Sequence, residues 1–172
     1  PLGIEAEFYF PSWKQCLERT ADGYAFQVAV SSSFAQSRTH SFIYTRSYYR
    51  TQQSYFYARE RFPTPPVIKK ADDLYRHGHV CGRYSYNYEG AGQLKNADMV
   101  RVAKSYSALV ARTLNGDCAF FIGRPSVLEG FRLLGENLID NDLIAYQPVP
   151  EATPDYFYML ISRNSPYADE LK

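Results

Sequence analysis

The sequence predicts an α/β fold made of two lobes, and three observations point to this class. Residues 79–124 alternate short apolar runs with polar or helix-forming stretches, a pattern typical of parallel strands joined by crossovers. A proline-rich stretch, Phe62–Ile68, separates these elements from an earlier set. A strong strand pattern over Asp155–Arg163 is expected to return to the first lobe. We therefore expect one lobe over residues 1–61 and 151–172 and a second over 62–150, each a mainly parallel sheet flanked by helices.

The composition excludes several classes of protein. Of the 172 residues 45% are hydrophobic, which is enough for a core, and the formal net charge is only +1. A charge so close to zero gives no electrostatic reason to expect binding to nucleic acid or to an anionic membrane. The apolar runs are far shorter than the roughly 20 residues needed to cross a bilayer. No signal peptide is visible, and the chain opens at Pro1 as a processed or trimmed chain would.

The first lobe is expected to begin with a strand and a capped helix. Ile4–Phe10 alternates apolar and polar residues, which favours a strand. Ser12 can cap a helix that runs from Trp13 to about Ala21, and the following Gly23 can end it. The remaining elements expected here are a strand at Tyr24–Val30, a polar turn with a short helix at Ser31–Arg38, and strands at Ser41–Thr45 and Gln53–Glu60.

The second lobe is expected to contain three parallel strands. After a short helix at Lys69–Gly78, the apolar runs His79–Gly82, Met99–Ala103 and Cys118–Gly123 favour strands, and Ser105–Gly116 favours a capped helix. Crossovers of this length join parallel strands, and ligands bind beyond the carboxyl ends of such strands. These ends are expected at the loops Gly82–Tyr86, Lys104-Ser105 and Gly123-Arg124.

The rest of the chain favours a helix at Pro125–Asn137, an extended segment at Leu143–Pro150, the strand at Asp155–Arg163 and a helix beginning at Ser165.

The three cysteines include no CxxC pair, which argues against a zinc site. Cys81 and Cys118 lie on the first and third parallel strands, which are neighbours in the usual doubly wound order. They form either a disulfide, as in secreted or periplasmic proteins, or two buried thiols.

No motif of a known catalytic type is present, neither a serine-nucleophile elbow nor a zinc-protease helix nor a phosphate-binding loop. Arginines are the more informative residues. Arg38 follows a serine-rich turn after an apolar strand, so its guanidinium either clamps a carboxylate or makes a surface salt bridge. Arg83 and Arg124 follow strands of the second lobe. Three arginines converging on one cleft would favour an anionic or zwitterionic ligand.

The order of these segments resembles the bacterial extracellular solute-binding proteins of family 3, which are type II periplasmic binding proteins of polar amino acid transporters. The stretches that carry the likeness are Glu7–Gly23, Ser31–Glu60, Asp72–Gly90, Leu109–Gly123 and Tyr156–Lys172. The resemblance covers nearly the whole chain. It implies a two-lobed fold that closes on a ligand by hinge motion, with the usual first strand and helix of lobe 1 lacking here.

The resemblance also implies a set of ligand-binding residues. Arg38 corresponds to the carboxylate-binding arginine of the family, and the other contacts that the resemblance implies are Ser31, Ser33, Tyr84, Ser85 and Tyr86. We add Trp13, Arg83 and Arg124 to the expected ligand-binding residues from their positions in the sequence. The chain departs from the family pattern at Ala35, where the family has threonine. It departs again at Gly123-Arg124, where the family has the carboxylate that holds the amino group of the ligand. Arg124 therefore favours a small anion other than a typical amino acid.

We accordingly expect a non-enzymatic, monomeric periplasmic protein that captures a small polar or anionic, amino-acid-like ligand and delivers it to the permease of an ABC transporter. No cofactor, metal or nucleic acid is implied. Two alternatives use the same fold. One is the sensing domain of a membrane receptor or kinase. The other is an enzyme of the dehydratase or lytic transglycosylase type, for which a buried Glu89 or Glu129 would be the candidate acid.

Overall fold

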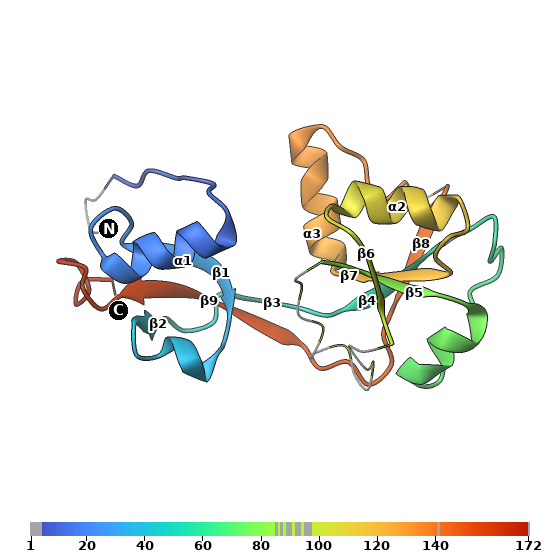
Figure 1. Cartoon of the computed structure of the whole chain (residues 1–172), viewed down its shortest axis with the longest axis horizontal. Coiled ribbons are helices and arrows are strands. Elements are labelled where there is room, and N and C mark those ends of the chain that lie inside the picture. The colour runs from blue at the N-terminus through green and yellow to red at the C-terminus, as the bar shows by residue number, and fades with distance from the viewer. Residues whose placement is uncertain are drawn as a thin grey trace. The chain divides into compact units, whose positions relative to one another are not determined.

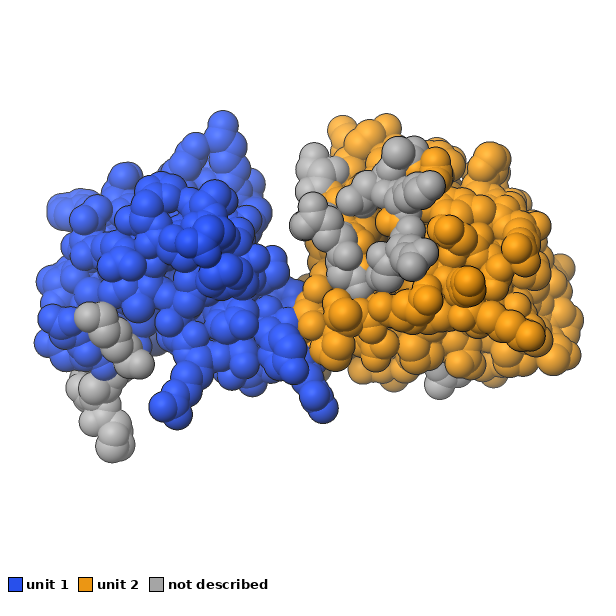
Figure 2. All heavy atoms as spheres, turned by 90° about the horizontal axis from the view of Figure 1, so that it is seen from below, with its two compact units in different colours: residues 1–50, 156–172 blue, residues 51–155 orange. Residues whose placement is uncertain are grey.

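The computed structural model describes residues 5–84, 86, 88, 91, 94, 98–140 and 142–171, and its elements form two compact units. Unit 1 comprises Pro1–Arg50 and Tyr156–Lys172, and unit 2 comprises Thr51–Asp155. Figure 2 shows the two units in different colours. Both contain helices and a sheet, so the expected α/β class is correct (Figure 1). Among the described residues, no helix combines the length and the apolar character that a membrane crossing requires.

The sheet of unit 1 is built around the last strand of the chain. Its order is β1-β9-β2, and β3 also pairs with β9. Both β1 and β2 run antiparallel to β9, so the unit is not the mainly parallel sheet expected. The elements of the unit are α1 (Trp13–Asp22), β1 (Val28–Ser33), η1 (Gln36–Arg38), β2 (Phe42–Tyr44), β3 (Tyr49–Thr51) and β9 (Asp155–Ser162), the last two reaching the boundary with unit 2.

Helix α1 forms where the sequence predicts it, because both of its ends are capped. The hydroxyl of Ser12 accepts a hydrogen bond from the backbone N–H of Gln15, and Gly23 adopts the left-handed conformation that ends a helix. The helix lies against the sheet (Figure 1). Its apolar stripe packs on a small core made by one residue from each of three strands, Ala29, Phe42 and Leu160.

The sheet of unit 2 has the order β6-β5-β7-β4-β8. Strand β5 runs parallel to both β6 and β7, which confirms the predicted parallel group, while β4 runs antiparallel to β7 and β8. The elements are β4 (Ser54–Ala58), η2 (Ala71–His77), β5 (Val80–Arg83), β6 (Val100–Ala103), α2 (Tyr106–Leu114), β7 (Phe120–Gly123), α3 (Pro125–Gly130), η3 (Phe131–Leu134) and β8 (Ile144–Pro148).

Both faces of this sheet are buried, because consecutive residues of its strands pack into two different apolar clusters. On β7, Phe121 packs with the residues of α2 and α3, while Phe120 and Ile122 pack on the opposite face with Leu74 of η2. A disulfide joins Cys81 of β5 to Cys118, with 5.9 Å between their α-carbons. Closing a loop of 37 residues stabilises unit 2 by up to about 4 kcal/mol on the chain-entropy estimate.

The division between the units differs from the expected one. Strand β4 was assigned to the first lobe, but all five of its residues are buried between β7 and β8 in unit 2. Phe62–Ile68 therefore lies inside unit 2 and is not a linker between units. Its prolines lack the backbone N–H that helices and sheets require, so the segment is extended although no domain boundary lies there.

Three other expectations were wrong in detail. Residues 5–10 form no strand, because no described strand pairs with them, and a lone extended segment cannot satisfy its backbone groups. The end of the chain folds into turns where a helix was expected from Ser165. Strand β1 begins four residues later than predicted, at Val28. The first crossover, residues 86–96, lies largely outside the described residues.

Candidate functional site

In unit 1, the predicted residues Arg38 and Trp13 lie together. Arg38 ends η1, and its Nη1 donates hydrogen bonds to the Ser32 hydroxyl at 3.0 Å and to the Ser33 carbonyl at 3.3 Å. Its guanidinium carbon lies 5.8 Å from the centre of the Trp13 ring, within the range of a cation–π contact. No carboxylate of the described residues forms an ion pair with Arg38, and the side chain is half-buried. Its Nε and Nη2 groups are therefore available to an anion.

The backbone beside Arg38 is held in an uncommon conformation. Ser31 has a φ of 61°, in the left-handed region that costs a serine about 1–2 kcal/mol, and the β1–β9 register shifts there. The Ser31 N–H donates to the Tyr48 hydroxyl at 2.9 Å, and the Ser31 hydroxyl lies 3.0 Å from the same oxygen. These contacts with the Tyr48 hydroxyl offset the strain at Ser31 and fix the backbone at this irregular point of β1. Ser33 contributes its carbonyl oxygen to Arg38, and its side chain is exposed.

The turn between β1 and η1 is supported by aromatic rings. The rings of Phe34 and Tyr44 lie 5.0 Å apart, and that of Tyr158 lies 5.5 Å from Tyr44. The Tyr44 hydroxyl accepts from the N–H of Ala35 at 3.1 Å and donates to its carbonyl at 3.2 Å. Ala35, where the family pattern has threonine, is thus anchored through its backbone. The sequence is rich in tyrosine, with 16 in 172 residues, but this composition does not indicate which rings meet.

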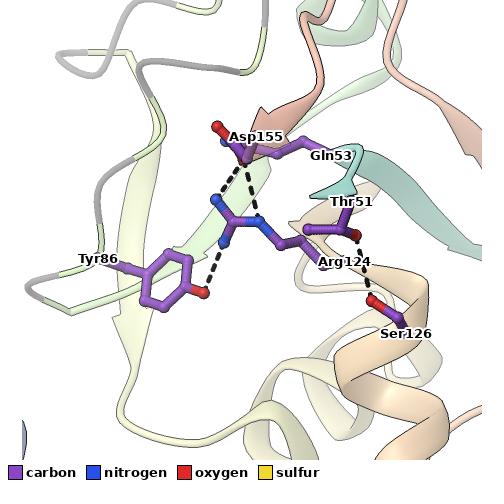
Figure 3. Close-up of polar contacts among 6 residues, drawn as sticks. All are labelled: Thr51, Gln53, Tyr86, Arg124, Ser126 and Asp155. Carbon is purple, nitrogen blue, oxygen red and sulfur yellow. Dashed lines mark hydrogen bonds and ion pairs between the residues drawn. The ribbon is translucent and has the colours of Figure 1, made fainter. Parts of the chain in front are cut away.

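In unit 2, Arg124 is already neutralised by the protein. The residue is only 6% exposed, and its Nε and Nη2 donate to Oδ2 of Asp155 at 3.0 and 2.5 Å (Figure 3). Its Nη1 donates to the Tyr86 hydroxyl at 2.6 Å. Burial opposes the positive charge, but the Tyr86 hydroxyl and the Asp155 carboxylate outweigh it and hold the pKa of Arg124 above its usual value. The guanidinium is therefore committed to an internal ion pair.

Two further contacts surround this pair. Gln53, which is 1% exposed, donates from Nε2 to Oδ2 of Asp155 at 3.4 Å. The hydroxyls of Thr51 and Ser126 lie 3.1 Å apart beside the arginine side chain (Figure 3). Neither Asp155 nor Gln53 was predicted. They belong to segments far from Arg124 in the sequence, and only the pairing of β4 with β7 and the return of the chain after β8 bring them together.

Arg83 lies in unit 2 with two tyrosines. Its guanidinium carbon is 5.5 Å from the centre of the Tyr86 ring and 4.8 Å from that of Tyr106, and its Nη2 donates to the Lys104 carbonyl at 3.2 Å. The Tyr86 ring also lies 5.3 Å from the guanidinium carbon of Arg124. The structure thus groups Arg83, Tyr86 and Arg124.

Not all predicted residues belong to these groups. Tyr84 is 56% exposed, and its backbone N–H donates to the Ala103 carbonyl. Ser85 lies outside the described residues. No group of three metal-ligating side chains occurs in the described part of the chain. A surface hollow of about 270 Å³ at Glu60, Arg61 and Gly116 contains none of the predicted residues in its lining.

Comparison with known proteins relates the fold to solved structures. No protein-family profile and no curated protein match the sequence. The arginine-, lysine-, histidine-binding protein ArtJ from Geobacillus stearothermophilus is 13% identical, with a TM-score of 0.67 over 99% of this chain and 71% of that one. A protein described as a binding component of an ABC transporter from Wolinella succinogenes, solved with lysine, is 15% identical, with a TM-score of 0.73 and the same coverage.

The VFT2 domain of BvgS from Bordetella pertussis is also similar, at 15% identity, with a TM-score of 0.66 over 94% of this chain and 64% of that one. The chain thus spans about two thirds of the length of these proteins. The identities are too low to transfer a ligand or an activity. The agreement over nearly the whole chain shows that it has the α/β fold of the two-lobed periplasmic binding proteins.

Proposed function

We propose that this is a periplasmic solute-binding protein that captures a small polar or anionic, amino-acid-like ligand for the permease of an ABC transporter. The observation that carries the proposal is the state of Arg38 in unit 1. Its guanidinium is oriented by Ser32, Ser33 and Trp13, and no described carboxylate neutralises it. A guanidinium held in this way is suited to two parallel hydrogen bonds with a ligand carboxylate.

The local backbone supports a binding role for the same region. The left-handed φ of Ser31 is a strained conformation, and such strain is common where a backbone is shaped for a ligand. Trp13 is 43% exposed, so its ring offers an apolar surface beside the arginine. Charge, polar backbone groups and an aromatic surface are the combination that a small polar acid requires.

The proteins of similar fold also support this proposal. The names of two of them state that they bind, or were solved with, cationic amino acids. We propose an amino-acid-like acid for this protein rather than a cationic amino acid, since Arg83 of unit 2 forms no ion pair with a described carboxylate, whereas Arg124 is neutralised by Asp155. We further propose that the protein acts as a monomer in the periplasm and needs no cofactor.

The enzymatic alternative receives less support from the described residues. Glu129 is exposed on α3, and the Tyr146 hydroxyl donates to it at 3.4 Å. It is therefore not a buried acid of the kind that acid–base catalysis favours. Glu89, the other candidate acid, lies outside the described residues.

A thermal-shift screen against amino acids, dicarboxylates and polyamines tests the proposal. We expect at least one acidic solute to raise the melting temperature of the full chain, and Arg38→Ala to abolish this stabilisation. Arg46→Ala, at an exposed position of the same unit, is the matched control and should retain it. Equal stabilisation of Arg38→Ala and the wild type would show that Arg38 does not bind the solute.

A further inference from the structure

Two polar groups in unit 2 have hydrogen-bonding capacity that the described residues do not use. Arg83, at the end of β5, is half-buried, and its Nε is buried without a hydrogen-bond partner in the described part of the chain. Tyr106, the first residue of α2, is 1% exposed, and its hydroxyl is also buried and meets no hydrogen-bond partner among the residues that the structure describes. Buried polar groups are satisfied in most proteins, so two such donors in one place call for an explanation.

These two groups are neighbours. The guanidinium carbon of Arg83 lies 4.8 Å from the centre of the Tyr106 ring. The Tyr86 ring, 5.5 Å away, contacts the same guanidinium. Arg83 therefore contacts two aromatic rings, one of which carries the Tyr106 hydroxyl.

The charge of Arg83 has no counter-ion among the described residues. No carboxylate of the described residues forms an ion pair with it, in contrast to Arg124, which pairs with Asp155 in the same unit. Cation–π contacts offset only part of the cost of removing a cation from water. The exposed Lys104, whose carbonyl accepts from Arg83, adds a further positive charge to this edge of the sheet. The local field therefore favours an anion and disfavours an ammonium group or a metal ion.

We propose that Arg83 and Tyr106 form an anion subsite that takes a carboxylate, with the guanidinium and the phenolic hydroxyl as its donors. Tyr106 can act as a donor at neutral pH. Burial, together with the nearby Tyr86 and Tyr88 side chains, raises its pKa, so the hydroxyl keeps its proton. The inference rests on the proposed function in one respect, that the carboxylate belongs to the captured solute.

Nuclear magnetic resonance of arginine side chains tests the subsite in the full chain. Sodium acetate is titrated into ¹⁵N-labelled protein, with sodium chloride at the same ionic strength as the reference. We expect acetate, but not chloride, to shift the Nε–H resonance of Arg83 saturably. That resonance is identified by its absence from Arg83→Gln. Tyr106→Phe should bind acetate about fivefold more weakly, the effect of one neutral hydrogen bond.

A matched control is Arg112→Gln, because Arg112 lies on α2 in the same unit and pairs with Asp117 at 3.4 Å. Its acetate affinity should equal that of the wild type. Equal shifts with acetate and chloride would overturn the subsite, and so would unchanged acetate affinity in Tyr106→Phe. Saturation by inorganic phosphate without saturation by acetate would overturn the assignment to a carboxylate.

The outcomes separate this inference from the proposed function. If acetate binds at Arg83 but no solute stabilises the protein through Arg38, the subsite stands and the proposed function fails. If a solute binds through Arg38 while the Arg83 resonance does not respond to acetate, only the subsite fails.

Discussion

Arg38 in unit 1 and Arg124 in unit 2 look alike in the sequence but differ in the structure. Each follows a predicted strand, and each was predicted to bind ligand. Arg38 is half-buried, rests near Trp13 and has no described carboxylate partner. Arg124 is 6% exposed and bound to Asp155 through two of its nitrogens. An arginine that is available to a ligand differs from one that stabilises the fold in its burial and in whether an internal carboxylate binds it. The sequence pattern reveals neither property.

The largest effect that tests this comparison is the loss of the buried ion pair. Arg124→Met leaves the largely buried Asp155 carboxylate without its cation, and we expect it to destabilise unit 2 by about 3 kcal/mol. Arg38→Met should cost less than about 1 kcal/mol, because no ion pair is broken. Urea unfolding combined with amide hydrogen exchange, resolved to each unit, measures both.

The double variant Arg124→Met/Asp155→Leu is the control for the ion pair. It removes both charges, so it should recover most of the lost stability. Equal losses for Arg38→Met and Arg124→Met would contradict the distinction between the two arginines.

A smaller effect on stability is expected from replacing the glycines that follow helices α1 and α2, one in each unit. Gly23 and Gly116 both have a positive φ, of 71° and 85°. A methyl group at Gly23 would lie 2.7 Å from the backbone carbon of Asn164, whereas at Gly116 it meets nothing within 4 Å. We expect Gly116→Ala to cost about 1 kcal/mol, from the conformation alone, and Gly23→Ala about 2–3 kcal/mol. Thermal unfolding of the two variants gives the difference, and similar costs would refute tight packing of α1 on the C-terminal turn.

The smallest expected effect is the pH dependence that Tyr75 gives to the stability of unit 2. Burial, followed by Asp98 and Asp72, raises the pKa of Tyr75 to about 12, against a lowering effect of Arg101. Because the folded pKa exceeds the unfolded value of 10.0, this contribution to stability is complete below pH 10 and is lost as the pH rises toward 12.

Tyr75→Phe should reduce the alkaline loss of stability by under about 1 kcal/mol, since the side chain is partly exposed and screened. Urea unfolding at pH 8 and pH 11 measures this change. Identical alkaline losses in the variant and the wild type would mean that Tyr75 does not titrate differently in the two states.

Much of the fold follows from local features of the sequence. Helix α1 was predicted from Ser12 and Gly23, whose capping roles act within a few residues. The parallel group of unit 2 was predicted because short apolar runs alternate with a capped helix. The segment ending at Phe10 was not predicted correctly, because alternation indicates a strand only where a partner strand exists. The position of β4 was missed for a related reason, since its pairing depends on β7 and β8.

The candidate site could be predicted only in part. Arg38 and Trp13 were proposed as binding residues from the order of motifs, and the structure places them together. The partners that decide the state of each arginine could not be found in this way. Ser32 is one of three consecutive serines with no distinguishing context, and Asp155 lies 31 residues from Arg124, beyond another strand. Such pairs depend on tertiary structure and have no local pattern.

The most direct test of the account is the affinity of Arg38→Gln for the solute that most strongly stabilises the wild type in the thermal-shift screen. Isothermal titration calorimetry should show binding weakened by about tenfold to a hundredfold, as expected when charge-assisted hydrogen bonds to a carboxylate are lost. Arg46→Gln should bind as tightly as the wild type. An Arg38→Gln variant that binds the solute with unchanged affinity would contradict the claim that Arg38 is the anion-binding residue of unit 1.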